Sequence, residues 1–542
     1  MSIHAQSLTP STAALQFQDA ASCLRWIAAL PITNVQLAQK MLVDQVAALT
    51  AAEVPALERL KILDALKETV NFAQAEVAKR YIGKPLPLDQ ADALAWKSVT
   101  GLWQALGANY QRCLDAYREG DLPISPFAAL ITLRCLRAAG YALFEHYQVY
   151  REPAAADWRA LHRLFAFAEE QGLSRMRVQD VFARHEADTS CAEAYTHVLL
   201  ANLANPYSLT VRQMAFVRRW LDKWSSLVNL SAQPLPPGAI PPIAVDFNGD
   251  APAMLAESIP HSPSVRYLDL EQISKSLRQT INLLKQGQTP GKLGLGEDAH
   301  QPGCESLIML LYVQWCRAGT LRTEERHPAD DPAEVCFGIA DTHNLLGGND
   351  KPAVEAAPSF SSRDKWEMDN LGYSMRLSTS AKVPSVKKSE NWQILNQSTS
   401  GFMCMLREPS GLLRMSHNQL LAVKRGADGA ARLGTVQWIR VNEQNECQCG
   451  LRMFQGTPKA ISVRPSNFNL PGKLGFEQAL LLPEVAMPAT PMCVVLPAGW
   501  FQAGRMIELQ GEKKQVAKLL ALIERGADFD RASIVMVEGA SS

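Results

Sequence analysis

The sequence lacks the features that mark membrane-spanning, secreted and disulfide-stabilised proteins. No stretch of eighteen uncharged apolar residues occurs, and the most apolar candidate, residues 307–316, is too short to span a bilayer. The first 18 residues contain neither the basic segment nor the apolar core of a secretion signal. The 11 cysteines are scattered through apolar runs and form no disulfide framework. We therefore expect a cytoplasmic protein that does not insert into a membrane.

The sequence also lacks an excess of charge of either sign. Its 54 Lys and Arg residues balance its 54 Asp and Glu residues. A balanced chain has no overall field to attract a nucleic acid polymer or an anionic membrane, so neither is expected as a partner. The hydrophobic (47%) and charged (20%) fractions are those of an ordinary globular protein, and 542 residues are too many for one hydrophobic core.

No pattern in the sequence is typical of an enzyme or of a metal site. Cys447 and Cys449 could form a thiolate pair, but no second Cys or His pair has zinc spacing. The cluster of His185, Asp188 and Cys191 is the best place for an active site, so an enzyme with its site in the helical region stays open as an alternative. Our first expectation is a protein with no catalytic residues, no metal and no cofactor.

Residues 1–232 have the residue spacing of an all-helical domain. Apolar residues recur every three or four positions, Ala, Leu, Glu, Gln and Arg dominate, and alternating β-branched runs are absent. The spacing predicts helices over residues 21–29, 37–49, 56–81, 88–118, 126–150, 154–172, 175–186, 191–203 and 210–230. We expect a domain of seven to nine helices.

Proline then changes the pattern. Five prolines lie between residues 234 and 242, followed by an Asn-Gly-Asp turn and by Pro260 and Pro263. Because such a density of proline forbids a continuous helix, residues 233–263 are expected to form an extended linker between domains. Residues 264–317 would be a helical connector, with helices at 268–286 and 305–317.

Beyond Pro328 the sequence predicts strands. The first set comprises residues 334–339, 392–395, 402–406, 419–424, 433–441 and 447–454. Short strands separated by turns at this spacing are typical of a small antiparallel barrel. A second set comprises residues 459–464, 478–482, 492–497, 505–509, 515–522 and 532–537. This second set predicts another small β-domain over residues 457–542.

The first set of strands carries two polar motifs. Arg322-Thr-Glu-Glu-Arg326 precedes the first strand, and Asn396-Gln-Ser398-Thr-Ser-Gly401 lies between two strands. The planar donor fork of a guanidinium matches phosphate oxygens and the O6/N7 edge of guanine. Asn and Ser provide short donors and acceptors, and glycine permits close approach without a Cβ.

Together the two motifs resemble the signature of the bacterial PilZ domain family, an Arg-x-x-x-Arg followed by Asp/Asn-x-Ser-x-x-Gly. The resemblance implies a six-stranded barrel that binds cyclic di-GMP at its lip. By this resemblance Arg322 and Arg326 would grip phosphate and guanine edges. Asn396 and Ser398 would contact guanine, and Gly401 would leave room for the ligand.

The chain departs from the family pattern in two places. Residues 346–390, rich in Ser, Lys and Pro, separate the motifs more widely than is usual and look like an insertion or a long surface loop. No clear helix follows Phe454, where the family often has one. A hairpin tip can absorb such an insertion because the entropy of loop closure grows slowly with length. The barrel would then cover residues 318–456.

The sequence therefore predicts a multidomain α + β protein. An N-terminal all-α helical domain would precede an antiparallel, PilZ-like β-barrel and a second small β-domain. Its function would be that of a cyclic di-GMP-binding signalling receptor or adaptor, which converts nucleotide binding into a change of domain arrangement or of partner binding. The helical domain would bind an unknown protein partner. The alternative is a structural or interaction protein with a degenerate, nucleotide-blind barrel.

Overall fold

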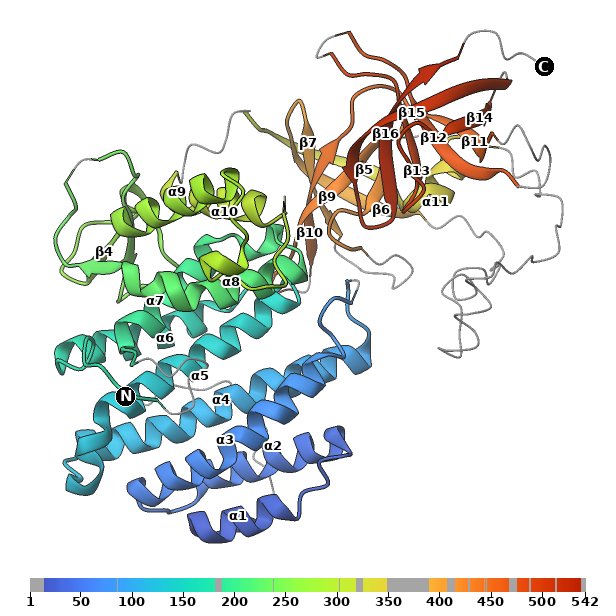
Figure 1. The fold of residues 1–542 in the computed structure, drawn as a ribbon. Coiled ribbons are helices and arrows are strands. Elements are labelled where there is room, and N and C mark those ends of the chain that lie inside the picture. The colour runs from blue at the N-terminus through green and yellow to red at the C-terminus, as the bar shows by residue number, and fades with distance from the viewer. Residues whose placement is uncertain are drawn as a thin grey trace. The chain divides into compact units, whose positions relative to one another are not determined.

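The chain folds into two compact units. One is Met1–Thr323 together with Arg440–Gln444, which we call the helical unit, and the other is Glu324–Ile439 with Asn445–Ser542, which we call the barrel unit (Figure 1). The computed structural model describes residues 14–84, 86–180, 188–236, 238–301, 303–317, 325–348, 389–406, 415–426, 429–442, 444, 446–466, 475–486, 489–511 and 514–537.

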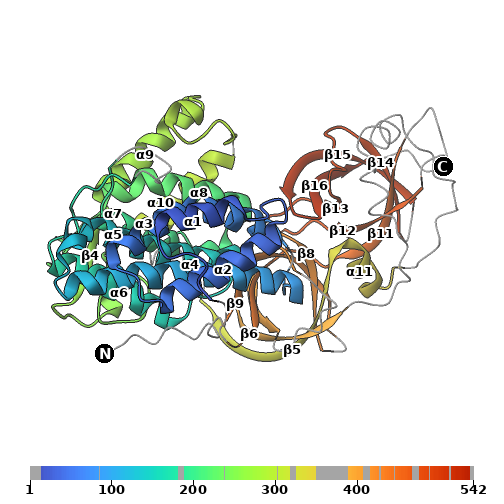
Figure 2. The same ribbon diagram turned by 90° about the horizontal axis from the view of Figure 1, so that it is seen from below.

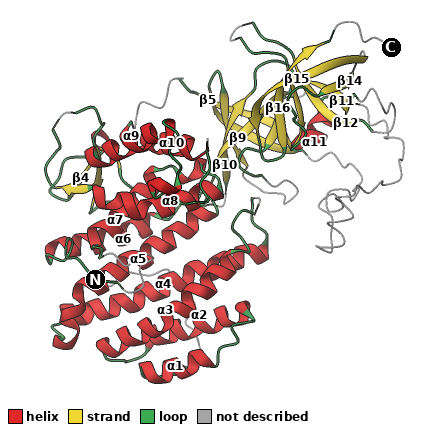
Figure 3. Ribbon diagram, viewed as in Figure 1, coloured by secondary structure: helices red, strands yellow, loops and turns green. Residues whose placement is uncertain are grey.

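Within its described residues the helical unit begins with eight α-helices, in agreement with the residue spacing (Figure 3). Polar caps fix several of their starts: the Asp89 side chain accepts a hydrogen bond from the amide of Asp92, and Thr210 forms a reciprocal capping box with Gln213. The helices are Ala20–Ala28 (α1), Val35–Ala51 (α2), Ala56–Ala78 (α3), Gln90–Arg118 (α4), Ala128–Gln148 (α5), Ala155–Glu170 (α6), Cys191–Leu203 (α7) and Val211–Trp224 (α8).

One predicted helix, over residues 175–186, is wrong over the part that the structure describes. Val178 pairs with Thr189 through two backbone hydrogen bonds, of 2.8 and 3.0 Å. The side chain of Asp180 turns into the protein and is buried. Residues 181–187 lie outside the described residues. Tertiary pairing and one buried ion cluster therefore override the local helical spacing in residues 175–180.

Helix α5 lies at the centre of the helical unit, where it packs against α4, α6 and α7. By length and composition the segment Leu122–Gln148 could cross a membrane, but 72% of its most apolar window is buried inside the structure. A Cβ built on Gly140 of this helix would lie 2.8 Å from a methyl group of Val198 on α7. Burial and close helix packing of this kind are typical of a core helix.

A buried ion cluster joins α3 and α5 to the segment that follows α6. The carboxylate of Asp180 accepts hydrogen bonds from Lys67 at 3.3 Å, from Arg134 at 3.4 Å and from Arg137. Burial raises the pKa of the Asp180 carboxyl, but the cations of Lys67, Arg137 and Arg134 outweigh it and hold this pKa below its usual value. The ionised carboxylate is thus the common counter-ion of three cations.

The proline-rich residues, for which the sequence predicts an extended linker, instead contribute two strands to a small sheet. The strands lie in the order β1 (Asn229–Ser231), β4 (Val265–Asp269), β2 (Ile243–Asp246) and β3 (Met254–Leu255). The ring of Phe247 packs edge-on against Phe165 and Tyr195 of the helical unit. The prolines flank these strands and do not interrupt them, so side-chain packing holds the segment in place.

Two further helices complete the helical unit close to their predicted positions. They are α9 (Glu271–Lys285) and α10 (Gly303–Cys316). The indole of Trp315 on α10 donates a hydrogen bond to the carbonyl oxygen of Leu200 on α7 at 3.0 Å. Trp315 also lies edge-on to Trp224 of α8, so an apolar contact anchors α10 on the helical core.

In its described residues the barrel unit contains two closed, antiparallel, six-stranded barrels, which confirms the predicted β-barrel and shows that the second small β-domain is also a barrel. The first barrel has the strand order β10-β7-β6-β5-β8-β9 and the second β11-β12-β13-β16-β15-β14. The first comprises His327–Phe337 (β5), Glu390–Gln397 (β6), Gly401–Leu406 (β7), Leu420–Arg425 (β8), Arg432–Val441 (β9) and Cys447–Met453 (β10). The second comprises Lys459–Pro465 (β11), Glu477–Leu482 (β12), Cys493–Pro497 (β13), Met506–Gln510 (β14), Lys514–Arg525 (β15) and Phe529–Met536 (β16).

A helix that the sequence did not predict, α11 (Gly338–Leu345), follows β5 and packs against strands of both barrels (Figure 2). Gly338, the first residue after β5, has a φ of +77°, a conformation that glycine adopts without strain. Ile339 and Leu345 of α11 contact a hydrophobic cluster to which both barrels contribute. The cluster comprises Cys336, Leu420, Ala422, Leu433, Phe454, Leu480, Leu482, Cys493, Val495 and Phe529. Most of residues 346–390, the expected insertion, lie outside the described residues.

We expect Asp180→Asn to lower the free energy of unfolding of the helical unit by about 3 kcal/mol, because the change removes the buried carboxylate that Lys67, Arg134 and Arg137 share, although Arg134 keeps its ion pair with Asp64. Urea denaturation followed by circular dichroism measures this loss. Asp188→Asn, at an exposed position nearby, is the control and should change the free energy by less than about 0.5 kcal/mol. Equal stability of Asp180→Asn and the wild type would contradict the structural role of the cluster.

Candidate functional site

The structure describes four of the five candidate ligand-binding residues. Arg326 is exposed and lies immediately before β5. Asn396 lies near the end of β6, Ser398 lies in the turn that follows, and Gly401 is the first residue of β7. Arg322 lies outside the described residues. In an antiparallel barrel the start of β5, the end of β6 and the start of β7 share one rim, so the four residues belong to a single edge of the first barrel.

Arg326 contacts the second motif directly. Its Nη1 donates a hydrogen bond to Oδ1 of Asn396 at 2.8 Å, across 70 positions of sequence. Because the pair is exposed and its acceptor is neutral, this bond contributes little stability. A phosphate oxygen is a stronger acceptor for a guanidinium than a side-chain amide. The arginine is therefore placed beside the turn in a contact that an anionic ligand can replace.

A change of strand register sets the direction of Asn396. The pairing of β6 with β7 shifts between Ile394 and Asn396, and the pairing of β6 with β5 also shifts. An irregularity of this kind re-aims the side chains that follow it. The amide of Ser398 donates to the carbonyl oxygen of Gly401 at 2.9 Å and closes the turn. The Ser398 hydroxyl has no hydrogen bond to any residue that the structure describes.

Gly401 has a structural role that the sequence analysis did not anticipate. A Cβ built on this residue would overlap the carbonyl oxygen of Leu451 on the neighbouring strand β10. Gly401 pairs with Arg452 of that strand and is buried. The close approach of β7 to β10 therefore requires glycine here, whether or not a ligand also needs the space.

Two arginines on the same rim escaped the sequence analysis. Arg425 is the last residue of β8 and Arg432 the first of β9. Their guanidinium carbons lie 4.9 and 5.3 Å from the centre of the Phe402 ring. Nη2 of Arg425 donates to Oε1 of Gln397 at 2.7 Å and lies 3.3 Å from a carboxylate oxygen of Asp331. No local motif marks these arginines, because only closure of the barrel brings strand ends from β8 and β9 to the turn after β6.

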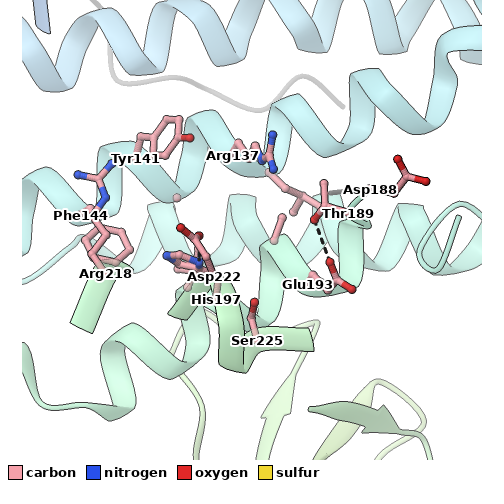
Figure 4. A pocket seen from close by; sticks show the side chains of 14 residues that line it. Arg137, Tyr141, Phe144, Asp188, Thr189, Glu193, His197, Arg218, Asp222 and Ser225 are labelled. Carbon is pink, nitrogen blue, oxygen red and sulfur yellow. Dashed lines mark hydrogen bonds and ion pairs between the residues drawn. The ribbon is translucent and has the colours of Figure 1, made fainter. Parts of the chain in front are cut away.

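The helical unit contains a separate cavity of about 150 Å³ between α5, α7 and α8 (Figure 4). His197 of α7 lies 3.4 Å from the carboxylate of Asp222 on α8. Glu193 accepts a hydrogen bond from the Thr189 hydroxyl at 3.0 Å. The guanidinium of Arg218 lies over the Phe144 ring, 5.1 Å from its centre. Both acidic and basic side chains line the cavity. The cavity therefore shows no preference for an anionic or a cationic ligand.

The sequence left open an enzyme whose active site lies around His185, Asp188 and Cys191, close to this cavity. His185 lies outside the described residues, and Asp188 lines the cavity. Cys191 is fully buried, and burial raises the pKa of its thiol to about 12. A thiol that stays protonated at neutral pH is a poor nucleophile. Among the described residues, no group of three His, Cys, Asp or Glu side chains could hold a metal ion.

Comparison with known proteins matches regions in both units. Residues 21–236 match the family model described as "Cyclic-di-GMP receptor FimW, N-terminal domain". Residues 471–536 match the model described as "FimW C-terminal beta-barrel domain", which coincides with much of the second barrel. The Cyclic-di-GMP receptor FimW of Pseudomonas aeruginosa is 22% identical over 560 aligned residues, which cover 94% of this chain and 89% of that protein. This chain is similar to a nucleotide receptor over nearly its whole length.

We expect Gly401→Ala to destabilise the barrel unit by about 1–3 kcal/mol even without ligand, because the added methyl group forces β7 away from β10. Thermal unfolding of the ligand-free protein measures this effect. Gly475→Ala is the control, since a Cβ at Gly475 meets no atom within 4 Å. If Gly401→Ala melts like the wild type, the glycine is not needed for strand packing.

Proposed function

We propose that this chain is a receptor for cyclic di-GMP, which it binds on the rim of its first barrel. The observation that carries the proposal is the contact of Arg326 with Asn396, which unites two motifs that resemble the PilZ signature. The similarity to a cyclic-di-GMP receptor along the chain supports the same ligand. The first barrel lies between the two regions that the family models match, so its assignment as a PilZ-like domain rests on the motifs and on the six-stranded barrel.

The residues at the rim suit a guanine dinucleotide. Arg326 is exposed and can place its donor fork on a phosphate or on the O6/N7 edge of guanine. Asn396 has both a donor and an acceptor for a base edge, and the Ser398 hydroxyl has no partner among the described residues that a ligand would need to displace. Arg322 would join them by the same resemblance.

Binding at this rim would be communicated through β5 and α11. Strand β5 starts beside Arg326, and α11 follows its other end and packs against both barrels. A ligand that fixes the start of β5 therefore acts on a strand that also contributes Cys336 to the hydrophobic cluster between the two barrels. The ligand can shift the receptor between two arrangements only by its difference in affinity for them.

Two further features accord with a signalling role. The proposed ligand is bound and released unchanged, and the helical unit, which carries the match to the receptor's N-terminal domain, would bind the protein partner. All 11 cysteines are free and buried, which is consistent with a reducing compartment such as the cytoplasm.

Isothermal titration with cyclic di-GMP tests the proposal. We expect the wild type to bind with a Kd in the micromolar range or below. Arg326→Ala should weaken binding by at least about tenfold, the value of one charge-assisted hydrogen bond. Because Arg326 is exposed, the melting temperature of that variant should stay close to that of the wild type.

Two outcomes would reject the proposal. The first is a folded wild-type protein that releases no heat with the nucleotide, as the nucleotide-blind alternative requires. The second is an Arg326→Ala protein that binds as tightly as the wild type. Arg505→Ala, at a half-buried arginine of the second barrel, is the control for loss of an arginine away from the rim, and it should leave binding unchanged.

A further inference from the structure

The rim that carries the two motifs also carries an unbalanced pair of cations. Strand β8 ends at Arg425 and β9 begins at Arg432, on the same edge of the barrel as the end of β6 and the start of β7. Both guanidinium groups lie against the buried ring of Phe402, which directly follows Gly401 of the second motif. Two like charges therefore contact one aromatic ring beside the candidate site.

The acids nearby do not neutralise this pair. Among the described residues Arg425 has one carboxylate partner, Asp331, whose side chain is 54% exposed. Its Nε is buried and has no hydrogen-bond partner among the residues that the structure describes. Arg432 is half-buried and has no hydrogen bond or ion pair with any residue that the structure describes. Burial lowers the pKa of the Arg432 guanidinium, and the neighbouring Arg425 cation lowers it further.

Two other arginines of the barrel unit have carboxylate partners, unlike Arg432. Arg464 on β11 also lies over an aromatic ring, 4.6 Å from the centre of Phe476, but it donates to Glu508 through Nε at 2.9 Å and Nη2 at 2.7 Å. Arg452, on the same rim as Arg432, is paired with Glu524. A guanidinium that has no acceptor in the protein takes its hydrogen bonds from water or from a ligand, so the donors of Arg432 are available to an anion.

We propose that Arg425 and Arg432 form an anion subsite that binds a phosphate of the same nucleotide. This inference rests on the proposed function, and it adds two strands, β8 and β9, to the site. Cyclic di-GMP carries two phosphodiester groups, so Arg326 and the turn would serve one face of the ligand while Arg425 and Arg432 take a phosphate. The ligand supplies the acceptor that Arg432 lacks among the described residues, and it gives Arg425 a second anionic partner besides Asp331.

Arg432→Met tests the subsite, because methionine preserves packing against Phe402 and removes the charge. We expect its Kd for cyclic di-GMP to rise at least about tenfold. The ligand-free variant should melt within about 2 °C of the wild type or above it, because it loses an uncompensated cation. Arg432→Lys retains the charge without the planar fork and should bind with intermediate affinity.

Arg464→Met is the matched control, since it removes a stacked arginine that does have a carboxylate partner. We expect it to lower the melting temperature and to leave the Kd unchanged. If the wild type binds, Arg326→Ala fails to bind and Arg432→Met binds like the wild type, the subsite is wrong while the receptor assignment stands. If the wild type does not bind, both fail. An Arg432→Met protein that melts early and binds normally would make Arg432 architectural and would also overturn the subsite.

Discussion

Closure of the first barrel is the constraint on which the candidate site depends. Arg326 and Asn396 are 70 positions apart, and neither lies in a segment that would bring it to the other by local structure. Antiparallel pairing of β5 with β6 aligns the start of one strand with the end of the other. The remaining pairs close the ring and bring the ends of β8 and β9 to the same edge. The site is thus a property of the rim and not of either motif alone.

The same strand links the rim to the rest of the barrel unit. Cys336, near the end of β5, belongs to the hydrophobic cluster that the two barrels share. The backbone then turns at Gly338 into α11, which packs on strands of both barrels. Packed cores of this kind resist continuous deformation and shift between discrete arrangements. A ligand at the start of β5 therefore acts on a strand whose other end belongs to this interface.

Much of this fold was accessible from the sequence, and what was missed has physical causes. Apolar spacing located α1 to α8 and the strands of both barrels, because each element buries one regular face. It failed for residues 175–180, where Asp180 enters a buried ion cluster, and for the proline-rich segment, where the packing of Phe247 supports strands β2 and β3. The two motifs were recognisable, but Arg425 and Arg432 were not, since only strand pairing brings them to Phe402. The requirement for glycine at position 401 likewise arises from a neighbouring strand.

Amide hydrogen exchange with and without cyclic di-GMP tests the central claim most directly, because it locates the ligand by the backbone that it protects. The account predicts slower exchange in three segments of the first barrel, residues 325–331, 396–402 and 423–434. Slower exchange confined to α5, α7 and α8 around the cavity of the helical unit, with these three segments unchanged, would contradict it.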